Sequence, residues 1–210
     1  DEVHHPNIIQ GMKFSLSITD AIFPRYHHAA LRVLEPAQPR CFQMPHAATE
    51  NFFKEIREDK KETVLLSGAT QPKFYPLRQQ AYILLANRNT KIVPRSHPGY
   101  QYRPDPEQAG REFAEEISKH LLAISGGGFE PHLPGAFIYA KHFEIPAAGT
   151  ALITDEEMIP YLQEYGFKAG YHYIATSRPG LEDTIDYWLD PHNREELKLI
   201  TKRGQDLVRK

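Results

Sequence analysis

The sequence predicts an α/β protein with a Rossmann-like, doubly wound parallel sheet, and three observations lead to this prediction. From Thr63 onward, short apolar runs alternate with segments in which apolar residues recur every three or four positions. The runs are nearly continuous in apolar character, which is typical of strands buried on both faces of a parallel sheet. Glycine follows several runs directly, as Gly68 follows 63–67. We therefore expect about five strands separated by helices.

The expected elements follow one another along the chain. Pro76 and Pro106 each stand where the first turn of a helix tolerates proline. Within 136–156, we expect a helix that Pro146 interrupts near Phe143, because proline has no N–H to donate. Gly149 should then end this helix in the left-handed conformation. Strands are expected at 63–67, 91–94, 120–124, 150–154 and 171–175, and helices at 76–87, from 106, from 136, at 156–165, 180–188 and 192–210.

Bulk properties limit the classes of protein to consider. A chain of 210 residues is long enough for one sizeable core, and its net charge of −2 gives no general attraction to nucleic acid. Cys41 is the single cysteine, so an intrachain disulfide and a thiolate metal cluster are excluded. No apolar run approaches ~18 residues and no signal peptide is recognisable, so we expect no transmembrane segment and a cytoplasmic location.

The domain organisation is expected to have two parts. Residues 61–210 should form the Rossmann-like domain. Residues 1–60 are harder to interpret and should be a linker and the remnant of another domain, because the regular alternation begins only at Thr63. The chain opens at Asp1 without a methionine, which suggests a fragment of a longer protein.

The carboxyl ends of parallel strands meet at one edge of the sheet, where ligands of such folds bind. The loops expected there are 67–71, 95–99, 125–128 and 154–156. Three of them combine glycine with small hydroxylic residues, a composition that lets backbone N–H groups reach an anion. Each loop by itself is also ordinary turn chemistry, and no dinucleotide or P-loop motif is present.

Three charged or titratable side chains near this edge each allow more than one interpretation. Arg78, on the first turn of a helix, would bind a diphosphate or be exposed to solvent. His97 would donate to a phosphate, transfer a proton or bind a carbonyl. Glu144 lies among apolar neighbours, where it would accept hydroxyl hydrogen bonds from a ligand or point to solvent. The 11 histidines show no metal-ligand spacing, so no metal is expected.

Several segments together resemble a known family. The segment KHFEIPAAGTALITD at 141–155 is similar to the donor-domain motif of GT-B-fold glycosyltransferases of the group 1 type, and is closest to the spore-maturation-like branch. The segments LEDTIDYWLDP at 181–191 and ITKRGQDLV at 200–208 resemble the helix and the tail that follow in that branch. The resemblance extends over roughly 40–210, and its specific part is 136–208.

This resemblance implies a C-terminal half that binds a nucleotide-sugar donor. The glutamate of the motif accepts the ribose hydroxyls in the family, and basic residues lie near the diphosphate. A hexosyltransferase-type transfer to a glycan or another hydroxyl acceptor is implied, with the nucleotide-sugar as substrate and no further cofactor. The predicted donor-binding residues are Glu144, Arg78, Lys141, Gly68, Gly149 and Thr150, with His97 as the catalytic residue.

Two departures from the family pattern bear on this prediction. Ala136 stands where many retaining members carry a first, sugar-side acid, which leaves retaining or inverting chemistry open. The acceptor domain of a complete GT-B enzyme is largely absent from this chain. The alternatives are a non-catalytic nucleotide- or glycan-binding module, or a purely structural Rossmann-like partner.

Overall fold

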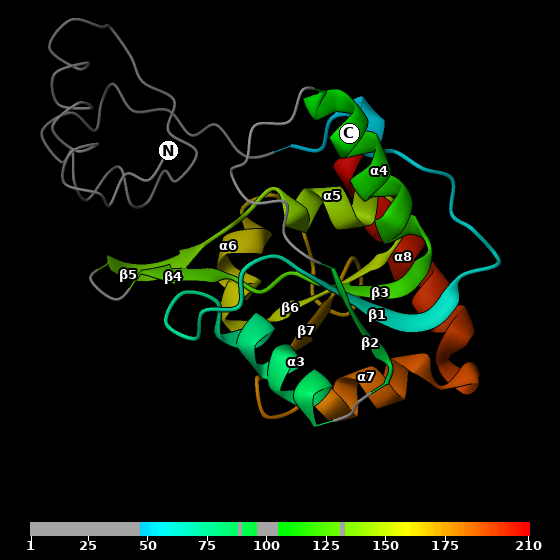
Figure 1. Cartoon of the computed structure of the whole chain (residues 1–210). Coiled ribbons are helices and arrows are strands. Elements are labelled where there is room, and N and C mark those ends of the chain that lie inside the picture. Colours follow the sequence, from blue (N-terminus) through cyan, green and yellow to red (C-terminus); the bar gives the residue numbers. More distant parts are fainter. Residues whose placement is uncertain (1–46, 88–89, 96–104, 131–132) are drawn as a thin grey trace, which may run out of the picture.

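The computed structural model describes residues 47–87, 90–95, 105–130 and 133–210. Five strands form one sheet in which every neighbouring pair is parallel, in the order β2-β1-β3-β6-β7 (Figure 1). The strands are β1 (Lys61–Ser67), β2 (Ile92–Arg95), β3 (His120–Ile124), β6 (Ala151–Asp155) and β7 (Ile174–Thr176).

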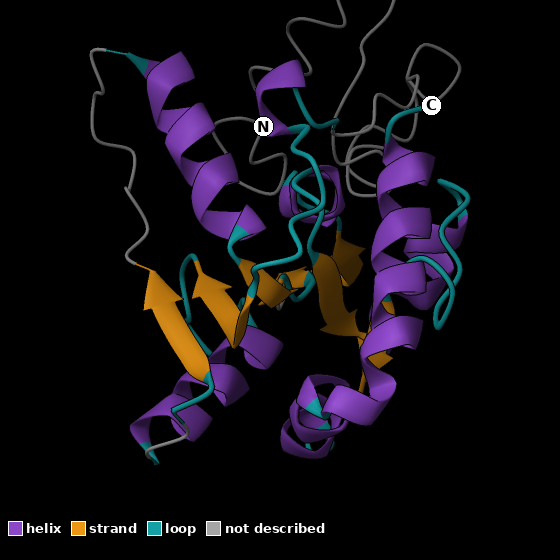
Figure 2. Cartoon of the chain, turned by 90° about the vertical axis from the view of Figure 1, so that its right-hand side faces the viewer, coloured by secondary structure: helices purple, strands orange, loops and turns teal. Residues whose placement is uncertain are grey.

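Helices cover both faces of this sheet (Figure 2). One face packs against α3 and α7, and the other packs against α4, α5 and α6. Helix α8 closes the chain and packs against α5 and β6. The α-helices are α3 (Pro76–Ala86), α4 (Pro106–Ser118), α5 (Lys141–Ala147), α6 (Ile159–Gln163), α7 (Leu181–Leu189) and α8 (Arg194–Val208), and the 3-10 turns are η2 (Glu50–Phe52), η3 (Glu156–Met158) and η4 (Pro191–Asn193).

Alternation along the central strands builds two hydrophobic cores. In β1, Val64 and Leu66 face the α3 and α7 side, whereas Leu65 between them faces the α4 and α5 side. All three side chains are buried because both faces of the sheet are covered. The predicted α/β class with a doubly wound, Rossmann-like parallel sheet is therefore confirmed.

The strand order creates a topological switch point. From β1 the chain passes to β2 on one side, and then returns to β3 on the other side of β1. The loops after β1 and β3 therefore leave the sheet in opposite directions at its carboxyl edge, the position at which ligands of such folds bind. Gly68 begins the first of these loops, and Gly126 and Gly127 lie in the second.

One small antiparallel element was not predicted. Strands β4 (Gly128–Glu130) and β5 (Leu133–Phe137) pair as a hairpin that is separate from the main sheet and projects from it (Figure 1). The helix expected from Ala136 was therefore wrong at its start, because Ala136 belongs to β5 and the helix begins at Lys141. Apolar residues at three- and four-residue spacing fit a helix, yet here they continue across a strand, a turn and a helix.

Other boundaries differ by a few residues. Pro146 does not interrupt α5 near Phe143 but lies inside its last turn, which ends at Ala147. Gly149 follows with a φ of 71°, as expected for a helix end. The last strand begins at Ile174, because residues 171–172 belong to a turn.

The described part of the lead-in packs on the domain. Phe52 is buried and meets Phe113 edge to face with 6.1 Å between ring centroids. The backbone N–H of Lys54 donates to the carbonyl of Ala147. The expected remnant of another domain in residues 1–60 falls largely on 1–46, outside the described residues, and stays a prediction.

Candidate functional site

Two cationic side chains meet at the end of β1. The Lys141 ammonium donates to the carbonyl oxygen of Ser67 at 3.3 Å. A β-carbon on Gly68 would lie 2.5 Å from Arg78 Nη1 and 2.6 Å from Lys141 Nζ. Gly68 has a φ of 103°, a conformation that glycine adopts without strain. The structure thus brings together three of the residues predicted for the donor site.

Neither cation forms an ion pair with an acidic side chain among the described residues, although the charge of Asp155 acts on Arg78 and that of Glu144 acts on Lys141. Arg78 is only 5% exposed, its Nε makes no hydrogen bond, and no ion pair joins Arg78 or Lys141 to an acid of the described segments. Burial lowers the pKa of Arg78. Burial also lowers the pKa of Lys141 to about 8, and the charges of Arg78 and Arg95 act in the same direction. Buried charges without a counter-ion are costly, so this cluster is suited to an anion.

Glu144 stands one helical turn after Lys141 on α5 and is partly buried. Burial raises the pKa of its carboxyl group to about 7, and the charge of Lys141 opposes this rise. Of the two interpretations left open by the sequence, a glutamate turned fully to solvent does not agree with this burial. A partly desolvated carboxylate beside a cation cluster can accept hydrogen bonds from a polar ligand.

The glycine loop after β3 is held by an acid that the sequence analysis did not single out. Asp155 ends β6, is 2% exposed, and accepts the N–H of Gly127 at 2.9 Å. Its other oxygen lies 3.4 Å from Nε of Arg178, which follows β7. A side chain on Gly126 would collide with Asp155 at 2.8 Å. The position of Asp155 in the expected loop 154–156 was the available signal, since a buried acid there needs donors.

Gly149 and Thr150 do not belong to this site. They precede β6 and therefore lie at the amino edge of the sheet, opposite the cation cluster. The Thr150 hydroxyl donates to the carbonyls of Ile117 and His120, and accepts from Lys60 at 3.1 Å. The structure therefore places them apart from the other predicted donor-site residues, because motif spacing does not reveal which end of the sheet a residue occupies.

His97, predicted as the catalytic residue, lies outside the described residues, and so does the cavity predicted between His97 and Arg78. Among the residues that the structure describes, no group of three or more metal-ligating side chains is found. No helix in the described part of the chain is long and apolar enough to cross a membrane.

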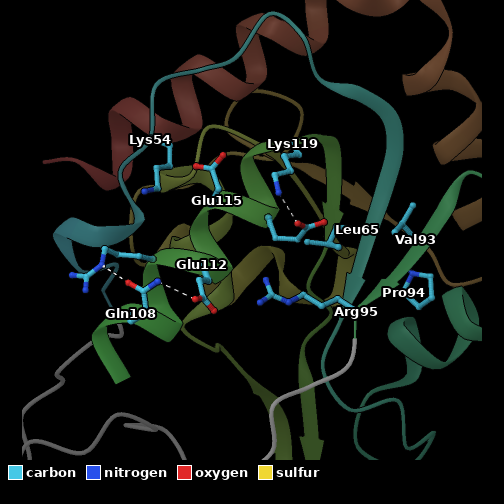
Figure 3. A pocket seen from close by; sticks show the side chains of 11 residues that line it. Lys54, Leu65, Val93, Pro94, Arg95, Gln108, Glu112, Glu115 and Lys119 are labelled. Carbon is cyan, nitrogen blue, oxygen red and sulfur yellow. Dashed lines mark hydrogen bonds and ion pairs between the residues drawn. The ribbon is translucent and has the colours of Figure 1, made fainter. Parts of the chain in front are cut away.

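A cavity of about 580 Å³ lies between α4 and the β1–β2 side of the sheet (Figure 3). Arg95, at the end of β2, reaches into it and lies over the Phe113 ring at 4.6 Å. Lys141 Nζ lies 5.8 Å from the same ring. The cavity is polar, with Lys119 and Glu116 ion-paired at 3.0 Å in its wall. It adjoins the cation cluster through Arg95 but is lined by neither Arg78 nor Glu144.

Comparisons with known proteins agree with this fold. Neither a scan against protein-family models nor a search of curated proteins gives a match. Among solved structures, TarM is similar with a TM-score of 0.53 and 9% identity, over 95% of this chain and 42% of TarM. The pneumococcal O-GlcNAc transferase GtfA, solved with UDP and GlcNAc, gives a TM-score of 0.49 and 13% identity, over 85% of this chain and 39% of GtfA.

The C-terminal domain of LpcC, a glycosyl transferase group 1 family protein from Francisella tularensis, gives a TM-score of 0.48 and 11% identity, over 76% of this chain and 95% of that domain. Similar solved structures thus include glycosyltransferases, at low sequence identity. This chain spans less than half the length of TarM and GtfA.

Proposed function

We propose that this chain is the donor-binding half of a GT-B glycosyltransferase of the group 1 type. The single observation that carries the proposal is the meeting of Arg78 and Lys141 at Gly68, where neither forms an ion pair with an acid among the described residues. Two cations at this edge of a Rossmann-like sheet suit the diphosphate of a nucleotide-sugar. The likeness to the spore-maturation branch stays a prediction from the sequence.

Glu144 supplies the second part of the proposal. Its partly buried carboxylate lies on the same helix as Lys141, so both face one ligand from α5. A carboxylate accepts two hydroxyl hydrogen bonds at once, which suits the vicinal hydroxyls of ribose. In this arrangement Lys141 and Arg78 bind the diphosphate and Glu144 binds the sugar of the nucleoside.

The proposed reaction is transfer of a hexose from the nucleotide-sugar to an acceptor hydroxyl. The acceptor oxygen forms a bond to C1 of the hexose, the bond from C1 to the diphosphate oxygen breaks, and its electrons pass to the diphosphate. The acceptor hydroxyl gives up its proton to a base. Arg78 and Lys141 stabilise the negative charge that develops on the diphosphate. His97 remains our proposal for a catalytic group.

The acceptor site forms a separate part of the proposal. Because the chain spans 42% of TarM, we propose that a second domain or partner chain supplies the acceptor site, for a glycan or another hydroxyl compound. A nucleotide-sugar donor also leads us to propose a cytoplasmic location, which cell fractionation tests.

A thermal-shift screen with UDP, GDP, ADP and CMP and their sugar conjugates tests the proposal. A ligand at one hundred times its dissociation constant stabilises the native state by about 2.7 kcal/mol, a shift of several degrees for a domain of this size. At least one nucleoside diphosphate should raise the melting temperature, and Arg78→Gln should abolish the rise. Failure of all nucleotides to shift the wild type contradicts the proposal.

A non-catalytic nucleotide-binding module is the second candidate, and Ala136 favours it. The family's first acid would stand at this position, but here an alanine in β5 is 8% exposed and packs in the core. The two candidates differ in turnover. Slow hydrolysis of the donor by the chain, or transfer in the presence of the missing domain, supports an enzyme, whereas nucleotide binding without either supports the module.

A further inference from the structure

The Arg78 guanidinium lies against two tyrosine rings. Its central carbon is 3.8 Å from the centroid of the Tyr75 ring and 5.8 Å from that of Tyr139. The two ring centroids are 5.8 Å apart, with 59° between the ring planes. Tyr75 directly precedes α3 and Tyr139 lies between β5 and α5, so the two rings come from segments far apart in the chain.

The two tyrosine side chains contact this guanidinium directly. Arg78 has no ion pair among the described residues, and its buried Nε makes no hydrogen bond. A free arginine side chain samples many rotamers, and fixing them costs conformational entropy. Stacking on an aromatic face holds a guanidinium in place while its N–H edge stays available to a ligand. Here that edge includes Nη1, which lies over Gly68.

The backbone at Tyr139 is fixed through His142, which is hydrogen-bonded to Thr154 in β6. Nδ1 of His142 lies 3.1 Å from the backbone nitrogen and 3.2 Å from the carbonyl oxygen of Tyr139. Nε2 of the same ring makes a hydrogen bond with the Thr154 hydroxyl at 3.1 Å. His142 and Thr154 are both fully buried. On the other side, the Tyr139 ring fills the space beside Gly128, where a side chain would collide with it.

We propose that Tyr75 and Tyr139 are positioning residues that hold the Arg78 guanidinium over Gly68, so that it presents directed N–H donors to a diphosphate. We call the contact of the Tyr75 and Tyr139 rings with Arg78 the clamp. The identity of the ligand rests on the proposed function, whereas the geometry of the clamp does not. Stacking predicts that the rings matter and the hydroxyl groups do not. It also predicts that the rings act on the ligand only through Arg78.

Calorimetric titration of inorganic pyrophosphate into the full chain tests the inference. Tyr75→Leu removes the ring and should weaken binding by about fivefold or more, whereas the matched control Tyr75→Phe keeps the ring and should bind like the wild type. In an Arg78→Gln background, Tyr75→Leu should have no further effect. An equal loss in both backgrounds, or no loss in either, overturns the inference.

A measurement without ligand separates this inference from the proposed function. The Arg78 Nε–H signal in a ¹H–¹⁵N spectrum, assigned by its loss in Arg78→Lys, should be shifted by the ring current of Tyr75. The shift should persist in Tyr75→Phe and disappear in Tyr75→Leu. An unchanged signal in Tyr75→Leu overturns the clamp whether or not pyrophosphate binds. Failure of the wild type to bind pyrophosphate, with the ring-current shift present, contradicts the proposed function alone. Tyr139→Leu and Tyr139→Phe provide the same pair if Tyr75→Leu does not fold.

Discussion

Glu144→Gln should stabilise the protein above neutral pH and leave its stability nearly unchanged in mild acid. Burial raises the pKa of Glu144 from 4.5 to about 7 in the folded state. Between these values the folded state binds more protons than the unfolded state, so this group lowers stability as the pH rises from 4.5 to 7. Glutamine has the same size and cannot ionise, so the variant does not lose this stability as the pH rises.

The magnitude follows from the same pKa. One pKa unit corresponds to about 1.4 kcal/mol, which sets a ceiling of roughly 3 kcal/mol for Glu144 above pH 7. Glu144 is partly exposed, and solvent reduces this figure, so we expect about 1–2 kcal/mol. For a chain of this length, that gain raises the melting temperature by about 2–8 °C.

Thermal unfolding of wild type and Glu144→Gln at pH 5 and pH 8 measures the effect. We expect similar melting temperatures at pH 5 and a higher one for the variant at pH 8. Glu157→Gln is a matched control, because Glu157 is exposed and forms a surface ion pair with Arg178. A variant that is less stable than the wild type at pH 8 would refute the argument, since Glu144 would then be a stabilising partner of Lys141.

Three further predictions concern the cations and the glycines. Lys141→Met should be more stable than the wild type at pH 7 by about 1–3 kcal/mol, because burial lowers the pKa of this lysine to about 8. The difference in unfolding free energy should close as the pH rises from 8 to 10.5; denaturant unfolding across this range measures it, and a constant difference contradicts the prediction. Gly68→Ala should lose about 1–2 kcal/mol of stability, because alanine is strained at this positive φ. It should also weaken nucleotide binding, measured by calorimetry at one temperature, because the added methyl group displaces both cations. Gly204→Ala should lose about 1–3 kcal/mol of stability, because its β-carbon would lie 2.5 Å from the carbonyl oxygen of His172. Gly110→Ala in α4, with its nearest contact at 3.9 Å, should be neutral or stabilising. Equal effects on stability at both glycines would show that α8 does not pack as described.

The sheet was predictable because its strands are buried on both faces. The run at β3 matches its predicted bounds, since few other structures bury an apolar run such as the four residues that follow His120. The β4–β5 hairpin was not predictable in the same way. Its residues include Pro134 and Gly135, which are typical of turns, and nothing in their spacing distinguishes a strand from the start of α5.

The site was predictable in part for a related reason. Arg78 stands at the amino end of α3, which follows β1, so topology places it at the carboxyl edge. Lys141 begins α5 after the β4–β5 hairpin, and the helix expected from Ala136 did not reveal this position. Gly149 and Thr150 precede a strand, and the same rule would have placed them at the opposite edge. The clamp of Tyr75 and Tyr139 depends on side-chain directions across two distant segments, and the sequence does not encode that contact in any local pattern.

The most direct test of the central claim compares a ribonucleotide with its 2′-deoxy analogue in wild type and Glu144→Gln. The nucleoside diphosphate that gives the largest shift in the thermal screen is used, and calorimetry measures each affinity. If Glu144 accepts the ribose hydroxyls, removal of the 2′-hydroxyl should weaken binding to the wild type by about tenfold, the value of one charge-assisted hydrogen bond. The variant should bind both nucleotides with equal, weaker affinity. Equal affinities in the wild type, or the same difference in the variant, would contradict the assignment of this edge as a nucleotide-sugar site.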